Sequence, residues 1–334
     1  MIYLSNFFAR KVEAVSRQIE ESRGSNKNPI ITCGYFLNQK ILSFQDIKDN
    51  IWVFPKWLYP FVAFIVLILT KSDIHLFEDE PSWWRLTALN IRKRSIYVSL
   101  FKDIDENLIK YINKIKYITT IVVEDEISYR LIQQYLENKN IEVKLIYPSP
   151  LWKHKFTEGI STNHLLFASW NSGTLDELYE RGICDLLTIV EKSDAICTIV
   201  LRDNEIKELN SLINKKKITK KVNLLKPSDI DELKTAYELC NYTVMIPRAP
   251  VMKYTPNSII DGLVFGKLCI ISDNLRFSQT VREYGLGIVT SAPVENIIFP
   301  DREKYAKLMR SCFNWSITNI KYPYSDAIKE VYSK

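Results

Sequence analysis

The chain has 334 residues, of which 46% are hydrophobic and 25% are charged, as a packed soluble protein of two ordinary domains requires. Its formal net charge of +6 is spread along the chain rather than concentrated in one arm. No basic footprint therefore supports a nucleic-acid partner, and we expect none.

In the first half, apolar runs of strand length alternate with amphipathic stretches of helix length. Strands are expected at 1–4, 29–36, 51–54, 73–77, 95–101, 119–123 and 143–147. Helices are expected at 8–22, 57–70, 82–92, 105–115 and 126–138. Such alternation predicts a parallel sheet covered by helices.

The predicted helix at 58–70 (LYPFVAFIVLILT) is almost entirely apolar and lies between Lys56 and Lys71. A bilayer span needs about 20 apolar residues, so this segment is too short to cross a membrane. Two alternatives remain open, a helix buried in the core and a helix that docks on a membrane surface.

The six cysteines are scattered, lie mostly inside apolar segments and show no CxxC spacing. They are typical of reduced core residues, and the start of the chain has no long apolar block that would indicate a secretory signal. We therefore expect a cytoplasmic protein, with association to the inner face of the plasma membrane as a further option.

The alternation of strand-length and helix-length segments is interrupted at 148–163 (PSPLWKHKFTEGISTN) and then resumes. Strands are expected at 164–169, 195–201, 221–225, 242–247, 267–272 and 287–291. Helices are expected at 176–192, 204–215, 229–239, 257–265 and 278–284, with a helical tail within 302–332.

The predicted fold class is α/β, with two Rossmann-like, doubly wound domains. We expect them at 1–150 and 151–312, followed by a helical tail at 313–334 that can cross back to the first domain. Two such domains facing each other leave a cleft lined by the carboxyl ends of strands, where ligands bind in open α/β sheets.

The segment PNSIIDGLVFGKLCIIS, residues 256–272, predicts an anion site at a helix start. Thr255 is expected to cap a helix whose first residue is Pro256. The backbone N–H groups of Asn257 and Ser258 would then point outward at the positive end of the helix dipole, where a diphosphate fits. Asp261, about one turn further on, can accept hydrogen bonds from a pair of sugar hydroxyls, so the segment suits a nucleotide. Its alternative is a structural hydrogen bond, because a carboxylate on an apolar helix face needs a partner.

The same segment resembles the donor-binding segment of GT-B glycosyltransferases of the group 1, family 4 kind. HLLFASWNSGTLDELYERGICDLL, VNLLKPSDIDELKTAYELCNYTVMIP and YGLGIVTS are similar to further donor-domain segments, and SDIHLFEDEPSWW and VKLIYPSPLW to segments of the first domain and the crossover. The resemblance implies that Asp261 binds the ribose and that Arg181 stands near the donor. Where the family often shows two glutamates eight positions apart, this chain has Lys253 and Asp261, so the stereochemical outcome stays open. The family's N-terminal glycine-rich loop is replaced by SNFFAR.

Glycosyl transfer requires stabilisation of a leaving diphosphate, which fixed amides and cationic side chains can supply without a metal. Besides the backbone N–H groups of Asn257 and Ser258, the candidate groups for binding the diphosphate are those of Ser172, Gly173, Arg181, Arg202, Arg248 and Lys253. For Arg248 and Lys253 the alternative is a solvated loop, and for Arg202 it is an ion pair within the domain.

Acceptor chemistry is expected at the carboxyl end of the strand at 73–77. A general base near the acceptor hydroxyl is needed for inversion, and Glu78, Asp79 and Glu80 follow that strand. We favour Glu80, with Asp79 as the second candidate; the alternative is a cluster that caps the next helix. His75, inside the strand, is expected to be a core histidine.

Four aromatic residues of the same domain offer faces on which a sugar or a lipid-linked acceptor could stack, with burial in the core as the alternative. They are Trp57, Tyr59, Trp83 and Trp84.

No metal or other cofactor is expected. Two Asp-x-Asp pairs occur, at 103–105 and 229–231, but such pairs arise by chance in a chain with 25% charge, and Ser228 followed by acidic residues at a helix start is a routine cap. The three histidines lack ligand spacing, and neither a GxGxxG nor a GxxxxGK[ST] motif is present.

The resemblance implies an enzyme, a hexosyltransferase that moves sugar from a nucleotide-sugar donor to a glycan or lipid-linked acceptor during synthesis of a bacterial surface polysaccharide. Peripheral contact with a membrane fits such an acceptor. Two alternatives remain, a nucleotide-sugar 2-epimerase of the same fold and a non-catalytic subunit that binds nucleotide sugars.

Overall fold

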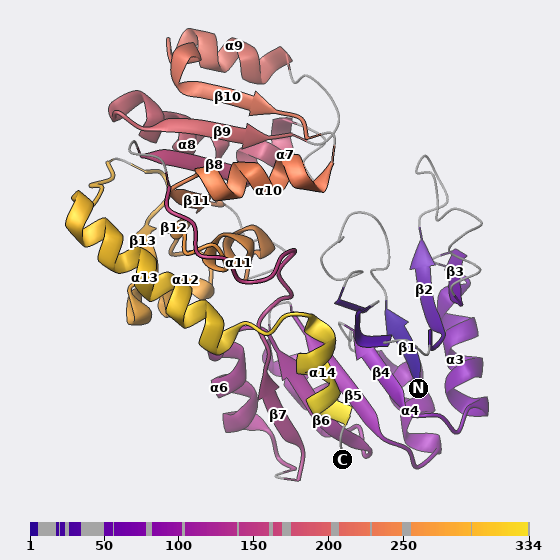
Figure 1. The fold of residues 1–334 in the computed structure, drawn as a ribbon. Coiled ribbons are helices and arrows are strands. Elements are labelled where there is room, and N and C mark those ends of the chain that lie inside the picture. The colour runs from indigo at the N-terminus through magenta and orange to yellow at the C-terminus, as the bar shows by residue number, and fades with distance from the viewer. Residues whose placement is uncertain are drawn as a thin grey trace. The chain divides into compact units, whose positions relative to one another are not determined.

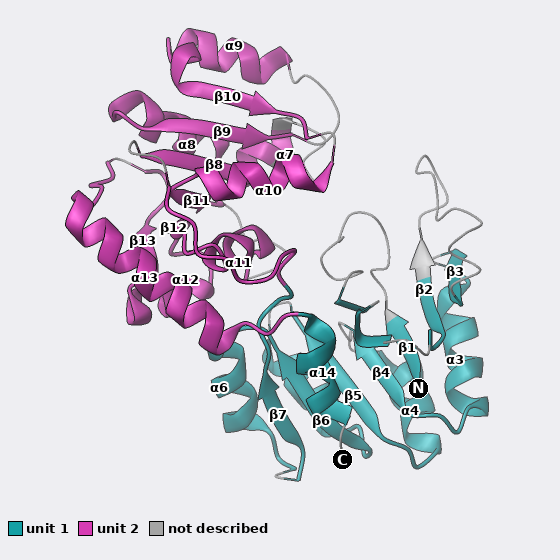
Figure 2. Cartoon of the chain, in the orientation of Figure 1, with its two compact units in different colours: residues 1–149, 323–334 teal, residues 150–322 magenta. Residues whose placement is uncertain are grey.

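A computed structural model of the chain describes residues 1–5, 18–19, 21–23, 27–34, 50–55, 57–77, 82–101, 104–138, 140–159, 163–168, 175–201, 207–227, 229–248, 255–294 and 296–332. The chain divides into two compact units (Figure 2). Unit 1 comprises residues 1–149 and 323–334, and unit 2 comprises residues 150–322. The returning tail thus begins at Pro323, later than the expected residue 313.

Unit 1 is built on a parallel seven-stranded sheet with the order β3-β2-β1-β4-β5-β6-β7 (Figure 1). The strands are β1 Ile2–Ser5, β2 Ile30–Gly34, β3 Ile51–Pro55, β4 Ile74–Phe77, β5 Ile96–Leu100, β6 Ile118–Val123 and β7 Glu142–Leu145. Each falls within or next to a predicted apolar run, because a strand buried on both faces is a nearly continuous hydrophobic run.

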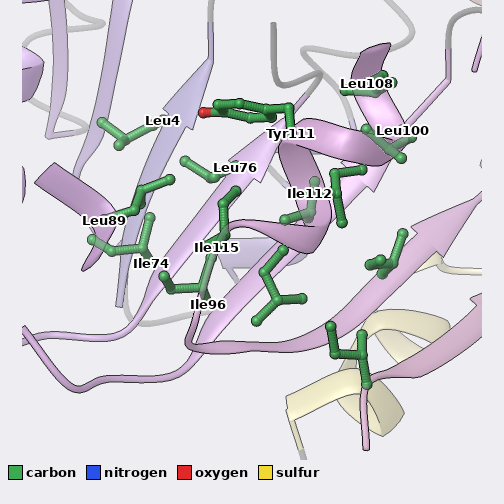
Figure 3. Packing of buried hydrophobic residues seen from close by; sticks show 14 of the residues in the cluster. Leu4, Ile74, Leu76, Leu89, Ile96, Leu100, Leu108, Tyr111, Ile112 and Ile115 are labelled. Carbon is green, nitrogen blue, oxygen red and sulfur yellow. The ribbon is translucent and has the colours of Figure 1, made fainter. Parts of the chain in front are cut away.

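Helices cover both faces of this sheet. They are α3 Tyr59–Leu69, α4 Trp83–Ile91, α5 Glu106–Asn113, α6 Glu126–Tyr135 and α14 Tyr324–Tyr332, with further helical residues at 18–19 and 21–23. Ile74 and Leu76 of β4 belong to the core formed with α3 to α6 (Figure 3). Phe77 packs with Ile19 on the other side, where α14 also packs against β5 and β6. This split follows from the two-residue period of a strand.

Unit 2 contains a parallel six-stranded sheet with the order β10-β9-β8-β11-β12-β13. The strands are β8 His164–Ala168, β9 Ile196–Val200, β10 Val222–Leu225, β11 Tyr242–Met245, β12 Leu268–Ser272 and β13 Gly287–Thr290. The helices are α7 Leu175–Glu180, α8 Ile183–Lys192, α9 Lys207–Lys215, η3 Thr219–Lys221, α10 Ile230–Leu239, α11 Asn257–Leu263, α12 Phe277–Tyr284 and α13 Arg302–Asn319.

Two predicted helices are each divided in two. The helix expected at 176–192 is α7 and α8, separated at Gly182, whose φ is +90°. A Cβ atom there would lie 1.9 Å from the carbonyl oxygen of Ile246, so the close approach of the residue that follows β11 requires glycine. The tail consists of α13 and α14, and Pro323 immediately precedes α14.

Both sheets are doubly wound, and each has one point where the strand order reverses. In unit 1 this switch point lies between β1 and β4, and in unit 2 between β8 and β11. Ligands of open α/β sheets bind outside the carboxyl ends of the strands at such a point. The predicted fold class of two doubly wound α/β domains is confirmed.

Among the residues that the structure describes, no helix has both the length and the apolar character needed to cross a bilayer. The cysteines with described side chains, Cys184, Cys197, Cys240, Cys269 and Cys312, all carry free thiols.

Candidate functional site

The switch point of unit 2 is the first candidate site, because most predicted donor residues follow its strands. β8 and β11 are neighbours, with Tyr242 opposite Leu165. Four predicted residues lie in segments after β8, β9 and β11 that are outside the described residues. They are Ser172, Gly173, Arg202 and Lys253.

α11 is the next described helix after β11, and it packs against that strand. Pro256 is its N-cap rather than its first residue, with an extended ψ of 129°, so the predicted cap at Thr255 is wrong by one position. The N–H groups of Ile259 and Ile260 both donate to the Pro256 carbonyl. Asn257 and Ser258 are half-buried, whereas the remaining five residues of the helix are buried.

Asp261 lies in the buried part of α11. Its side chain is 4% exposed, and Oδ1 accepts a hydrogen bond from the backbone N–H of Leu151 at 2.6 Å. Leu151 belongs to the start of unit 2, so Asp261 holds the first residues of the unit against α11. A carboxylate oxygen bound to a backbone N–H is the structural hydrogen bond that the sequence left as the alternative, and the ribose contact stays a prediction.

The packing of α11 on β11 fixes its position. A Cβ atom on Gly262 would lie 2.4 Å from Cγ2 of Thr243, a distance that real Cβ atoms do not tolerate. The absence of a side chain at Gly262 therefore lets α11 approach the sheet closely, which places Asn257 and Ser258 at its carboxyl edge.

Arg248, directly beyond β11, forms a bidentate ion pair with Asp185 of α8. Its Nε donates to Oδ2 of Asp185 at 2.6 Å and its Nη2 donates to Oδ1 at 3.0 Å. Oδ1 also accepts from the backbone N–H of Val294 at 2.9 Å. The Asp185 side chain is 2% exposed and that of Arg248 is 48% exposed, so a cation at the sheet edge is anchored by a buried anion.

This pairing raises the pKa of Arg248, with the hydrogen bond to Asp185 as the main cause. Asp185 is not among the residues predicted from the motifs. The signal was present in ICDLLTIV, where one carboxylate interrupts an apolar helix face and therefore requires a partner.

Arg181 lies at the break between α7 and α8, half-buried and beside Gly182. The backbone N–H of Arg248 donates to the carbonyl of Glu180 at 3.0 Å. The structure therefore brings Arg181 and Arg248, predicted from separate motifs, to neighbouring backbone positions.

The switch point of unit 1 lies between β1 and β4. Glu78, Asp79 and Glu80 follow β4 directly and lie outside the described residues, so their roles stay predictions. His75 is a core histidine, as expected. It is fully buried, with Nε2 2.8 Å from Oγ of Ser99 and Nδ1 hydrogen-bonded to the hydroxyl of Tyr332.

The acidic pairs act as helix caps where they are described. Asp105 accepts from the N–H of Leu108, and Asp229 accepts from the N–H groups of Asp231 and Glu232. Within the described ranges, no group of three or more His, Cys, Asp or Glu side chains is arranged to hold a metal ion.

Comparison with solved structures gives whole-chain similarities. A glycosyltransferase from Rickettsia africae ESF-5 is 15% identical with a TM-score of 0.65, covering 100% of this chain and 99% of that one. Alr3699/HepE of Anabaena in complex with UDP is 12% identical with a TM-score of 0.68, covering 99% of each chain. The chain has the GT-B glycosyltransferase fold. The lipopolysaccharide outer core galactosyltransferase WaaB, in its apo form, also has this fold; it is 10% identical with a TM-score of 0.60, covering 99% of each chain.

At these identities the similarity is one of fold. No protein-family model matches the sequence, and no curated protein matches it. The GT-B fold that the motif order predicted is thus confirmed by three-dimensional similarity, which persists where sequence similarity does not.

Proposed function

We propose that the protein is a metal-independent glycosyltransferase that moves a sugar from a nucleotide-sugar donor to a glycan or lipid-linked acceptor. The observation that carries the proposal is the GT-B fold match over the whole chain, which includes structures of Alr3699/HepE in complex with UDP, with UDP and glucose, and with UDP-glucose. The acceptor class is supported by the match to WaaB, whose name refers to the lipopolysaccharide outer core. The proposed setting is the cytoplasmic synthesis of a bacterial surface polysaccharide.

We assign the donor to the switch point of unit 2. The start of α11, where Asn257 and Ser258 are half-buried, would hold the diphosphate through backbone N–H groups at the positive end of the helix. The carboxylate of Asp261, whose Oδ1 accepts from the N–H of Leu151, would also accept a hydrogen bond from a ribose hydroxyl.

Cationic side chains would stabilise the charge that develops on the leaving diphosphate. Arg248 is the best supported of these, because its ion pair with Asp185 fixes the guanidinium at the end of β11 before any ligand arrives. A preorganised cation needs little reorganisation as the bond to the sugar breaks. Arg181, Arg202, Lys253 and the Ser172–Gly173 loop complete the proposed donor set.

The acceptor is assigned to unit 1. Glu80, or Asp79 beside it, would act as the general base that removes the proton from the acceptor hydroxyl as it attacks the anomeric carbon. A lipid-linked acceptor would bring unit 1 to the membrane surface.

The proposal is tested by isothermal titration calorimetry with free UDP, GDP, ADP and CMP, followed by turnover assays with the sugar nucleotides of any base that binds. Acceptor-dependent release of nucleotide supports it. Epimerisation of the donor without an acceptor would instead show that the protein is an epimerase. Binding without turnover in every acceptor mixture would show that it is a non-catalytic subunit.

A further inference from the structure

The outer face of α3 is apolar where a surface helix is normally polar. Tyr59, Ala63 and Leu67 face the core, which confirms burial for one stripe of the helix. On the opposite stripe Phe61, Ile65 and Leu69 are 66%, 54% and 68% exposed. These three recur every four residues and form a continuous line along the helix. The sequence left a core helix and a docking helix as alternatives, and α3 has a face suited to each.

Two exposed tryptophans stand at the starts of α3 and of the helix packed against it. Trp57, just before the helix, is 72% exposed, and Trp83, the first residue of α4, is 81% exposed. The two helices pack together, with Phe64 of α3 edge-on to Trp84 of α4 at 6.4 Å between ring centroids. Figure 1 shows α3 and α4 side by side. We call the surface formed by Trp57, Phe61, Ile65, Leu69 and Trp83 the α3 face.

Two exposed basic side chains flank the helices of the α3 face. Lys71 follows α3 and Lys93 follows α4, whereas Arg85 and Arg94 are buried, and Asp73 near Lys71 accepts a hydrogen bond from the backbone N–H of Ser95. Arg92 donates to the carbonyl of Ile68, and Arg94 donates to that of Thr70 at 3.0 Å. The basic segment 92–94 is thereby fixed against the last turn of α3, beside the exposed Lys71.

This combination identifies the partner by charge and shape. A second copy of the chain docking through the same face would bring like charges together, whereas an anionic bilayer attracts them. An 11-residue helix is about 16 Å long, too short to span but suited to lie in the interface plane. Tryptophan prefers the membrane–water boundary, because its ring is apolar and its N–H polar.

We propose that the α3 face is the surface by which the protein docks on an anionic lipid bilayer, with the apolar stripe in the interface and Lys71 and Lys93 among the headgroups. The proposal assigns the membrane contact of the proposed function to a defined surface. The docking itself does not depend on that function; only the expected advantage of docking, access to a lipid-linked acceptor, rests on it. The acceptor is assigned to the same unit, so docking through this face would bring that unit to a lipid-linked acceptor.

The test is flotation of the full chain with vesicles of phosphatidylcholine alone and of phosphatidylcholine mixed with phosphatidylglycerol, without donor or acceptor. The variant F61Q/I65Q/L69Q should lower binding to the mixed vesicles at least about tenfold. The matched control I230Q/L239Q/I317Q removes three comparably exposed apolar side chains of unit 2 and should bind like the wild type. The variant K71Q/K93Q should weaken binding to mixed vesicles and remove most of its salt dependence. Circular dichroism and thermal unfolding verify that each variant is folded.

Absence of wild-type binding to the mixed vesicles overturns the proposal, as does undiminished binding of the folded F61Q/I65Q/L69Q variant. A wild-type dimer that this variant converts to a monomer, with no vesicle binding, also overturns it and assigns the face to a second copy. Nucleotide calorimetry on the same preparation separates the two proposals. Binding of nucleotide without vesicles removes only the docking surface, and vesicle binding without nucleotide removes only the glycosyltransferase.

Discussion

Oδ1 of Asp261 accepts a hydrogen bond from the backbone N–H of Leu151 at 2.6 Å, so the residue proposed to hold the ribose also holds the start of unit 2. The two roles can be separated by substitution. Asp261→Asn retains an acceptor for Leu151 but removes the charge, and should lower nucleotide affinity roughly 10- to 100-fold with a small change in stability. Asp261→Ala should lower affinity and also reduce the free energy of unfolding by about 1–3 kcal/mol, because the buried N–H loses its partner.

Calorimetry with the free nucleotide and urea denaturation measure these two quantities. Wild-type affinity in Asp261→Asn would remove the carboxylate from the donor site and leave it a structural role alone.

The ion pair between Arg248 and Asp185 should show strong energetic coupling. In a double-mutant cycle of Asp185→Asn and Arg248→Gln, we expect a coupling free energy of about 1–3 kcal/mol. This lies below the cost of breaking a fully buried pair, because solvent reaches about half of the Arg248 side chain and screens the charge. Asn at position 185 still accepts from Val294, so the cycle isolates the guanidinium contact.

The exposed pair of Lys329 and Asp326 on α14 is the control, with an expected coupling below about 0.5 kcal/mol. Equal coupling for the two pairs, measured by urea denaturation, would show that Asp185 does not anchor Arg248.

The alternation of apolar runs was sufficient to predict the described strands and both parallel sheets. The alternation could not predict features that depend on contacts between residues distant in the sequence. The break at Gly182 arises because the chain must pass close to the Ile246 carbonyl, and the partner of Arg248 comes from a helix 63 residues earlier. The start of α11 shifted by one residue, because the local rule for proline at a first helical position competes with the extended backbone that Pro256 adopts here.

Gly182 can be tested against a second glycine with the same backbone handedness. Gly182 and Gly285 have φ values of +90° and +63°. A Cβ atom on Gly285 would meet only Cδ2 of Leu308 at 3.8 Å, whereas one on Gly182 would lie 1.9 Å from a carbonyl oxygen. Gly285→Ala should cost about 1 kcal/mol of unfolding free energy, and Gly182→Ala at least about 2 kcal/mol more. Equal thermal denaturation midpoints for the two variants would contradict the steric explanation.

Glu80→Gln tests the proposed general base. Because a glutamine cannot accept the acceptor proton, turnover should fall roughly 100-fold or more while donor affinity stays within about threefold of the wild type. Glu106→Gln, in an exposed ion pair on α5, serves as the control and should leave turnover unchanged. Retention of wild-type turnover by Glu80→Gln would transfer the role to Asp79 or remove it from this segment.

Burial of His75 should make the stability of the protein depend on pH. Desolvation lowers the pKa of His75 from 6.5 to about 3, so the folded protein keeps this imidazole neutral while the unfolded chain protonates it. Between pH 6.5 and pH 3 the unfolded state therefore binds more protons than the folded state. The contribution of the neutral imidazole to the free energy of unfolding is therefore complete above pH 6.5 and is lost as the pH falls from 6.5 towards 3. By pH 5 the wild type should lose about 2 kcal/mol of unfolding free energy that His75→Gln does not lose. Urea denaturation of both proteins at pH 7, 6 and 5 measures the difference, and parallel pH profiles would show that the imidazole can charge in place, beside Tyr332 and Ser99.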